Sequence, residues 1–178
     1  MRIQGETPVR QIRYVVAMSL DGYIAGPKGD VDWIIMDPGI DFGSMFSEFD
    51  TVLLGRETFQ VMVRSGNAVM PGMKMLVFSR TLQQRHYPDV TIVSENQQEV
   101  LASLREQPGK DIWLFGGGSL FRSLLDARLV DTVEVAVMPI LLGAGTSLLP
   151  APAKRARLNL VSHKVYETGI VSLKYAVK

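Results

Sequence analysis

The chain has 178 residues, with 19 Lys and Arg against 18 Asp and Glu, which gives a formal net charge of +1. This near-neutral balance gives no indication of a polyanion-binding surface, so we expect no nucleic-acid partner. The chain has no cysteine, which excludes disulfides, thiolate zinc sites and a cysteine nucleophile. Its two histidines, His86 and His163, have no second histidine at metal-ligand spacing, so no metal site is expected.

Composition and the lack of long apolar runs indicate a protein in solution. Apolar residues make up 47% of the chain and charged residues 21%, which is typical of a globular domain with a full core. The N-terminus has no apolar signal-peptide region, and no run reaches the roughly 18 apolar residues of a membrane span. We therefore expect a cytoplasmic protein with no membrane partner, a flexible arm at residues 1–11 and one domain at residues 12–178.

The first half of the chain alternates short apolar runs with loops and amphipathic segments. IRYVVAMS (12–19) is rich in β-branched residues, which predicts a strand buried on both faces, and a loop follows over LDGYIAGPKGDVDW (20–33). Apolar residues at helical spacing predict a helix over DFGSMFSEF (41–49), with Asp41 as its N-cap. A strand at 51–55, a helix at 56–63 and strands at 74–79 and 90–94 follow.

The second half continues the alternation and then changes to strands alone. We expect a helix over 96–107 capped by Asn96 or Ser94, a strand at 111–115, three glycines and a helix over 119–129. The segment 131–142 predicts a long strand stopped by Pro139 and the loop GAGTSLLP, and the alternating segments 157–167 and 170–177 predict a hairpin. Strands that alternate with helices form a largely parallel sheet covered on both faces. We therefore predict one α/β domain with an antiparallel hairpin at its C-terminal edge.

Three consecutive glycines, Gly116, Gly117 and Gly118, stand at the strand-to-helix junction in DIWLFGGGSLF. Each costs roughly 0.5–1 kcal/mol in backbone entropy relative to alanine. The glycines form a tight turn, or they let a phosphate lie against bare main chain at the helix N-terminus. A dinucleotide-binding fingerprint fits poorly, because Phe121 stands where its third glycine belongs.

Two further strand ends carry residues that suit a phosphate. In TVLLGRETF, Gly55 permits close approach, Arg56 offers a planar set of donors and Thr58 offers a hydroxyl. In MLVFSR, Ser79 and Arg80 suit the extra phosphate of NADP better than the ribose hydroxyls of NAD. Each feature alone is more often a helix cap or a solvated surface pair. Three of them at successive strand ends indicate a shared ligand.

The ordered motifs VVAMSLDGYIAG, VLLGRETF, VFSR and LFGGGSLF resemble those of the dihydrofolate reductase-like superfamily. The chain is most similar to the branch that contains the reductase domain of the riboflavin-pathway deaminase–reductases, which LVDTVEVAVMPILLGAGTSLL also resembles. The resemblance runs from Ile12 to Val177 and implies a dihydrofolate reductase-like fold, NADPH as cofactor, a small-molecule substrate and a homodimer. The strand VAVMPILL and the closing hairpin are candidates for the dimer interface; the alternative is that this strand belongs to the core.

The resemblance also assigns parts of NADPH to residues of this chain. The nicotinamide carboxamide would meet the region of Ala17, Ile24 and Ala25. The 2′-phosphate would meet Ser79 and Arg80, and part of the diphosphate or the adenosine side would meet Gly55, Arg56 and Thr58. The pyrophosphate would cross the glycine turn at Gly116, Gly117, Gly118, Ser119 and Leu120.

Hydride transfer to a C=N or carbonyl group also needs a proton, which a carboxyl in apolar surroundings with a raised pKa can donate. Candidates near the exit of the first strand are Asp21, Asp32, Asp37 and Asp41. Asp41 stands where dihydrofolate reductases carry the carboxylate that binds the pterin, or is a plain N-cap. Asp21 matches a position that faces the ribityl part of the substrate in the deaminase–reductase branch, or belongs to an Asp-Gly turn. Trp33 is a flat wall for a heterocyclic substrate or a loop aromatic packed on the core.

Two departures from the riboflavin branch shape the functional prediction. Phe115 stands where that branch has a glutamate before the glycines, and the chain shows no deaminase domain with zinc-binding His and Cys residues. We therefore predict an NADPH-dependent reductase of a small heterocyclic (pteridine- or pyrimidine-like) or carbonyl substrate. The alternatives are the pyrimidine reductase of riboflavin biosynthesis, a dihydrofolate reductase, and a non-catalytic nucleotide-binding module.

Overall fold

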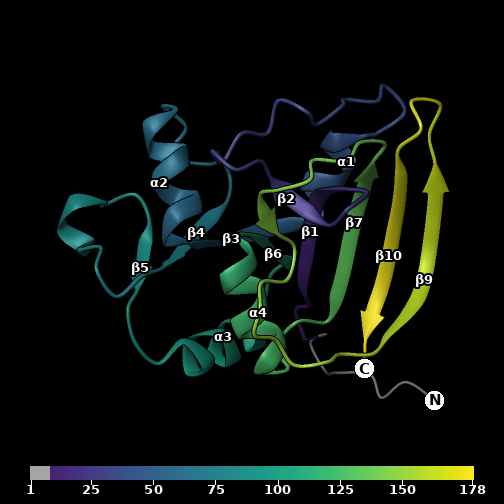
Figure 1. Ribbon diagram of the computed structural model, residues 1–178. Coiled ribbons are helices and arrows are strands. Elements are labelled where there is room, and N and C mark those ends of the chain that lie inside the picture. Colours follow the sequence, from purple (N-terminus) through teal and green to yellow (C-terminus); the bar gives the residue numbers. More distant parts are fainter. Residues whose placement is uncertain (1–8) are drawn as a thin grey trace, which may run out of the picture.

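The computed structural model describes residues 9–178, in which two short strands join the predicted ones. The strands are β1 (Ile12–Ser19), β2 (Tyr23–Ala25), β3 (Phe49–Gly55), β4 (Lys74–Phe78), β5 (Thr91–Val93), β6 (Asp111–Gly116), β7 (Thr132–Met138), β8 (Thr146–Ser147), β9 (Leu158–Val165) and β10 (Val171–Val177). One sheet has the order β5-β4-β3-β6-β1-β7-β10-β9, and β2 pairs with β8 in a second sheet. The strands from β5 to β7 in this order run parallel. β10 runs antiparallel to both of its neighbours, β7 and β9 (Figure 1).

Helices cover both faces of the large sheet: α1 (Phe42–Ser47), α2 (Arg56–Arg64), α3 (Gln97–Glu106) and α4 (Gly118–Asp126), with a short 3-10 helix at Gln84–His86. Buried side chains of α3 and α4 pack in one cluster with Leu53, whereas Phe59 of α2 packs in a second cluster with Val52 and Leu54. Because successive side chains of a strand point to opposite faces, α3 and α4 cover one face and α2 the other. Figure 1 shows α2 apart from α3 and α4. No helix within residues 9–178 is long and apolar enough to cross a bilayer.

This architecture confirms the predicted fold, a mostly parallel sheet flanked by helices with a C-terminal antiparallel hairpin. Local features differ from the prediction, including the end of α1 at Ser47 instead of Phe49 and the start of β3 at Phe49 instead of Thr51. The pair β2 and β8 lies in segments expected as loops, because strands of two or three residues are too short to show a periodicity. The strand expected over 131–142 ends at Met138, because Pro139 stops it as predicted, and α4 begins at Gly118 instead of Ser119.

The C-terminal strands differ in how they are covered. β7 lies between β1 and β10, and its Val133 and Val135 are buried, so this strand contributes to the core of the sheet. In contrast, every residue of the edge strand β9 is exposed and every residue of β10 is half-buried. The hairpin therefore presents the larger uncovered surface.

The predicted flexible arm is only partly described. Residues 1–8 lie outside the described residues, but Arg10, within the same predicted arm, is only 5% exposed. Its guanidinium donates to the Thr51 hydroxyl at 2.8 Å and also bonds Asp50 and the Lys110 carbonyl. The folded domain therefore begins before Ile12, because a buried arginine needs these partners to offset its lost hydration.

A second buried arginine joins the amino ends of the parallel strands, opposite to the glycine turns. Arg13 of β1 is 5% exposed and donates to both carboxylate oxygens of Glu134 on β7, at 2.7 and 2.9 Å. It also pairs with Glu48 and with Asp111. Burial alone would raise the pKa of Glu134, but hydrogen bonds from Arg13 and Thr132 outweigh burial and the pKa is lowered.

Candidate functional site

The predicted glycine junctions lie side by side at one edge of the sheet. β3 ends at Gly55, which pairs with Phe78 at the end of β4, and Leu54 pairs with Gly116 at the end of β6. Parallel strands place their carboxyl ends at a common edge, which is where ligands bind in such sheets. Both α2 and α4 begin at this edge, so their N-termini adjoin the glycines.

Bare main chain from the two junctions comes into contact. A Cβ atom on Gly55 would lie 3.6 Å from the Gly116 carbonyl oxygen and 3.6 Å from the Gly117 amide nitrogen. A Cβ atom on Gly117 would lie 3.3 Å from the Thr58 hydroxyl, and one on Gly116 would meet no atom within 4 Å. Gly116 has a φ of +143°, which favours glycine, and the Gly116–Gly117 peptide bond is cis. We call Gly55, Thr58, Gly116 and Gly117 the glycine cradle.

Gly118 has a different environment from the first two glycines of the turn. A Cβ atom on Gly118 would lie 2.6 Å from the Ser147 carbonyl oxygen and 2.9 Å from the Pro150 side chain. The Cα of Gly118 is therefore covered by protein, whereas the predicted contact of this residue with the pyrophosphate stays a prediction. Its amide, with those of Ser119 and Leu120, lies in the first turn of α4, where amides have no partner within the helix.

The large sheet splits between β1 and β6 near this edge. Pairing of β1 with β6 ends at Tyr14 and Leu114, whereas β1 continues alongside β7 to Ser19. β6 likewise continues alongside β3 to Gly116. The carboxyl ends of β1 and β6 therefore keep only one neighbour each in the sheet.

This split leaves backbone groups of Ala17 without a strand partner. The Gln11 carbonyl accepts from Ile112 of β6, and the Val15 carbonyl accepts from the Trp113 ring nitrogen at 3.1 Å. Odd-numbered residues of β1 thus direct their backbone groups toward β6. Ala17 follows the same alternation, so its N–H and C=O face the side on which pairing has ended. These are the groups predicted to meet the nicotinamide carboxamide.

A strap of residues 145–150 joins β2 to the start of α4, next to the glycine cradle. At one end, a Cβ atom on Gly145 would lie 2.1 Å from the Ala25 carbonyl oxygen, and the φ of Gly145 is +145°. At the other end, Ser147 covers Gly118. The strap therefore connects β2, with the predicted carboxamide residues Ile24 and Ala25, to the predicted pyrophosphate residues.

The predicted 2′-phosphate residues follow β4 at the same edge, and they differ in availability. Ser79 is buried, and its hydroxyl accepts the amides of Thr81 at 3.2 Å and Leu82 at 3.0 Å. Arg80 is exposed, and the guanidinium of Arg56 at the start of α2 is 45% exposed and lies 3.4 Å from Glu57. The two arginines are thus accessible, whereas the Ser79 hydroxyl shapes the turn.

Asp21 joins two loops. Its carboxylate accepts the Ser19 hydroxyl at 2.6 Å and the amides of Leu142 at 3.1 Å and Gly143 at 2.7 Å. The Ser19 hydroxyl, followed by these amides, holds the pKa of Asp21 below its ordinary value of 3.8. A proton donor needs a raised pKa, so this environment does not favour Asp21 as the catalytic acid, and its catalytic role stays a prediction. Both carboxylate oxygens are already engaged, which also argues against the predicted contact with substrate.

Asp41 and Trp33 lie in the segment between β2 and β3. The exposed Asp41 carboxylate accepts the Ser44 amide at 2.9 Å. Of the two roles considered for Asp41, a substrate-binding carboxylate or a helix N-cap, this contact is that of an N-cap. A solvated carboxylate does not meet the requirement for apolar surroundings, so the structure does not support Asp41 as the acid. Trp33 is half-buried, and its ring nitrogen donates to the Asp30 carbonyl at 3.1 Å. Its contact with a substrate stays a prediction.

An aromatic cluster, unpredicted from the sequence, lies on the α1 face of the sheet. The Phe46 ring of α1 is 5.2 Å from that of Trp113, which in turn is 4.9 Å from that of Phe115. Phe115 lies on the same face as Ala17, since Phe115 and Val15 pack against one cluster that contains Trp113, and Val15 and Ala17 of β1 point to the same face. The helical spacing of the phenylalanines predicted the helix α1 and its apolar face, but spacing alone does not show which strand that face contacts.

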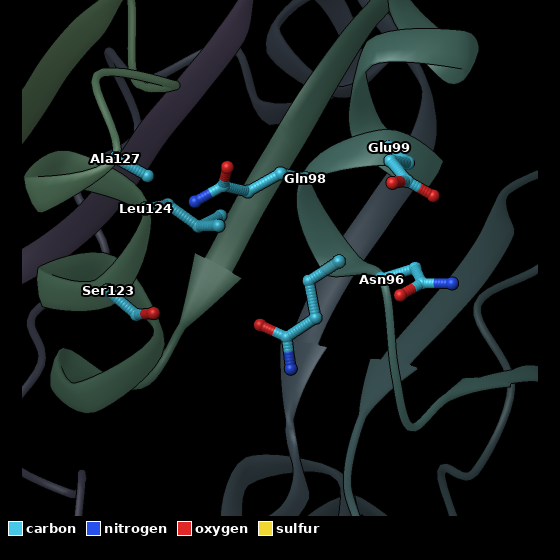
Figure 2. Close-up of a pocket in the computed structure, with 7 residues that line it drawn as sticks. Asn96, Gln98, Glu99, Ser123, Leu124 and Ala127 are labelled. Atoms are coloured by element: carbon cyan, nitrogen blue, oxygen red, sulfur yellow. The ribbon is translucent and has the colours of Figure 1, made fainter.

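A separate groove of about 380 Å³ runs between α3 and α4 (Figure 2). Figure 2 shows Gln98 of α3 extending toward Leu124 of α4. The groove is lined by Asn96, Gln97, Gln98, Glu99, Ser123, Leu124 and Ala127. It contains none of the predicted site residues, so the glycine cradle and the Ala17 backbone form the better candidate site.

Comparisons with known sequences agree with this geometry. Residues 10–172 match the family model described as the RibD C-terminal domain. The uncharacterized protein YyaP of Bacillus subtilis (strain 168) is 33% identical over 178 residues, which cover 93% of this chain and 94% of that protein.

Two solved structures are similar over nearly the whole chain. A putative riboflavin biosynthesis protein from Shewanella sp. PV-4 has a TM-score of 0.80 and 26% identity, over 94% of this chain and 99% of its own. A dihydrofolate reductase from Enterococcus faecalis, complexed with NADP(H), has a TM-score of 0.68 and 18% identity, over 94% and 96%. The fold is that of the dihydrofolate reductase-like superfamily, as predicted. Because the family model covers most of the chain, the protein belongs to the RibD C-terminal domain family.

Proposed function

We propose that the protein is an NADPH-dependent reductase that transfers a hydride to a small heterocyclic (pteridine- or pyrimidine-like) or carbonyl acceptor. The observation that carries this proposal is the glycine cradle, where Gly55 and Gly117 bring bare backbone together next to the Thr58 hydroxyl. Such a surface at strand ends and helix N-termini suits a diphosphate. The NADP(H) complex of the Enterococcus faecalis enzyme, which has the same fold, supports the choice of cofactor.

The residues of this chain fit the parts of NADPH in a consistent order. The cradle and the first-turn amides of α4 are suited to the pyrophosphate, and the free backbone groups of Ala17 are suited to the carboxamide. The strap holds these two regions in one unit. The exposed Arg80 and Arg56 are suited to the 2′-phosphate, because a guanidinium binds phosphate through several donors.

When bound, NADPH supplies the hydride, and the chain orients the acceptor and controls access of water. The apolar surface of Phe115 and Phe46 lies on the same face as Ala17 and suits a flat ring. The carboxylate of Asp21 is engaged by three donors, and that of Asp41 caps α1. We therefore propose that the proton comes from water.

Phe115 separates this proposal from the alternatives. An apolar side chain cannot accept hydrogen bonds from the pyrimidine that the riboflavin-pathway reductase reduces, which argues for a different acceptor. The family match and the riboflavin-related name of the Shewanella protein support a reductase in general. A non-catalytic nucleotide-binding module remains the competing class, and turnover decides between them.

Fluorescence titration with NADPH and NADH is the direct test. We expect NADPH to bind and Gly117→Ala to abolish binding, because a Cβ atom would stand on the surface of the cradle. Gly117 has a φ of −91°, which alanine accepts, so the variant should fold. Gly43→Ala in α1 is the matched control, since its Cβ would meet only the Asp41 carboxylate at 3.4 Å. Failure of the natural protein to bind millimolar NADPH would overturn the proposal.

Oxidation of bound NADPH with a panel of acceptors tests the chemistry. The panel contains dihydrofolate, the aminopyrimidine of the riboflavin pathway, other pteridines, carbonyl compounds and quinones. We expect turnover of at least one member and no preference for the aminopyrimidine. NADPH binding without turnover of any acceptor would favour the non-catalytic module.

We also propose that the protein forms a homodimer through the C-terminal hairpin. The edge strand β9 exposes Leu158, Leu160, Val161 and Val165, by 42% to 66%. A long edge strand with exposed apolar side chains associates readily, and an antiparallel pair of identical strands has two-fold symmetry. Light scattering should give twice the mass of one chain, and Leu160→Lys should give the monomer. A monomeric natural protein at micromolar concentration would contradict this proposal.

A further inference from the structure

Asp37 is a buried carboxylate in the segment between β2 and α1, and the proposed chemistry does not use it. It is 6% exposed, although its neighbours Met36 and Pro38 are exposed. Its Oδ1 accepts the Gly39 amide at 2.7 Å, and its Oδ2 accepts the Thr168 hydroxyl at 2.7 Å and the Thr168 amide at 3.3 Å. Thr168 belongs to the turn between β9 and β10, so one carboxylate joins two segments far apart in the chain.

A second set of contacts holds the same two segments together. Lys164 of β9 donates to the Gly39 carbonyl at 3.3 Å, and its ammonium lies 4.4 Å from the centre of the Tyr166 ring. A Cβ atom on Gly39 would lie 2.9 Å from Asp37 Oδ1 and 3.5 Å from the Tyr166 ring, so the fit is close. We call these contacts of Asp37 and Gly39 with Lys164, Tyr166 and Thr168 the hairpin joint.

Along the chain, Asp37 of the hairpin joint lies between Trp33 and Phe46, the two aromatic residues that we place on the acceptor side. Trp33 precedes Asp37 by four residues, and α1, which carries Phe46, begins five residues after it. The backbone between them is short and bonded, since the Ile40 amide donates to the Asp37 carbonyl at 3.1 Å. Phe46 then reaches the aromatic cluster of β6. Fixing Asp37 therefore fixes the path of residues 33–46 past the candidate site.

We propose that Asp37 is a positioning residue that, through Thr168, holds residues 33–46 in the arrangement that binds the acceptor. This inference rests on the proposed function. The carboxylate itself is engaged in the joint, so it acts through the segment and not by contact with the substrate. Its loss should weaken acceptor binding while the cradle, which lies on other elements, keeps its affinity for NADPH.

Two substitutions remove the joint and two serve as references. Asp37→Asn removes the charge that Thr168 stabilises, and Thr168→Val removes the hydroxyl donor. Thr168→Ser keeps the donor and should rescue the natural behaviour. Thr91→Val, an exposed threonine on the far edge strand β5, is the matched control. Each variant is first checked for folding by circular dichroism.

Steady-state kinetics should separate acceptor from cofactor. In Asp37→Asn and Thr168→Val we expect the KM of the acceptor to rise by about tenfold, the order of one charged hydrogen bond. The Kd of NADPH and the kinetics of Thr168→Ser and Thr91→Val should stay within twofold, a margin of about 0.4 kcal/mol. An unchanged acceptor KM in both joint variants, or an equal loss of NADPH affinity, would overturn the inference.

A fluorescence measurement that needs no turnover tests the hairpin joint independently of the proposed function. Trp33 is half-buried and Trp113 is 7% exposed, so acrylamide quenching of tryptophan fluorescence reports mainly on Trp33. We expect stronger quenching in Asp37→Asn and Thr168→Val than in Thr168→Ser and Thr91→Val. Equal quenching in all four would refute the joint even for a protein that reduces nothing. Stronger quenching in the absence of any reductase activity would support the joint and refute only the function.

Discussion

Gly118, the third glycine of the turn, lies against the carbonyl group of Ser147 so closely that a Cβ atom would come within 2.6 Å of the oxygen. The same atom would lie 2.9 Å from Pro150. Gly118→Ala should therefore lower the free energy of unfolding by about 1–3 kcal/mol, the usual cost of overpacking. Urea denaturation measures this change. A fully stable Gly118→Ala protein would show that the strap moves freely, which contradicts its role as a fixed connection.

Tyr14 of β1 carries a buried hydroxyl with no hydrogen-bond partner within the described part of the chain. Its ring is fully buried and stacks on Phe121 of α4 with centroids 3.9 Å apart, and burial raises its pKa. Tyr14→Phe removes an unsatisfied polar group and keeps the ring, so the free energy of unfolding should rise by about 1 kcal/mol. Tyr175→Phe on the half-buried β10 is the control. A loss of stability in Tyr14→Phe would reveal a partner for the hydroxyl.

Asp21→Asn distinguishes a structural carboxylate from an acid. Asparagine keeps one acceptor oxygen but places an amide group where a second acceptor is needed, so the midpoint of thermal unfolding should fall. Once an acceptor is known, the pH dependence of kcat should be the same in Asp21→Asn as in the natural protein if, as we propose, the proton comes from water. A titration step in kcat that disappears only in the variant would restore Asp21 as the acid.

Arg80→Ala tests the choice between NADPH and NADH. Arg80 is exposed at the end of β4, next to the end of β3 and the start of α2. If its guanidinium binds the 2′-phosphate, the variant should lose about tenfold or more in affinity for NADPH and little for NADH. Arg85→Ala, an exposed arginine in the following 3-10 helix, is the control. Equal weakening of both cofactors in Arg80→Ala would remove this residue from the 2′-phosphate site.

Acid should destabilise the protein through Glu134. Its pKa in the folded state lies below the ordinary value of 4.5, so its ionised form stabilises the fold above that value. This stabilisation is lost as the pH falls through the lowered pKa, so the free energy of unfolding should hold constant to about pH 5 and then decrease. Urea denaturation across this range measures the decrease. Glu134→Gln leaves Arg13 with one charged partner fewer, so this variant should be less stable at pH 7. Its free energy of unfolding should also decrease less steeply with falling pH. An equally steep decrease in the variant would assign the effect to other carboxylates.

Much of the fold followed from local patterns. The apolar runs of β1, β3, β4 and β6 and the helical spacings between them led directly to a parallel sheet with helices on both faces. Glycine, arginine and serine at strand ends identified the edge at which a ligand would bind. The fold predictions succeeded because strand burial and helix amphipathicity are recorded in the order of neighbouring residues, whereas the binding of a ligand at this edge stays a prediction. The motif resemblance added the superfamily, which the comparisons confirm.

Other features depended on contacts between distant segments. The difference between Gly117 and Gly118 arises because the strap, some thirty residues further along, covers one and leaves the other open. The partners of Asp21 likewise come from a distant loop, because the amides of Leu142 and Gly143 donate to its carboxylate.

The sequence by itself determined the order along the chain of the helices and of all strands except β2 and β8, the position of the glycine junctions and the superfamily. Only the tertiary structure decided which carboxylates are engaged, which glycine is covered and which backbone groups of Ala17 lack a strand partner. The physical reason is that a carboxyl's pKa and a glycine's accessibility depend on atoms that the fold brings within hydrogen-bonding distance, from positions that no local pattern links.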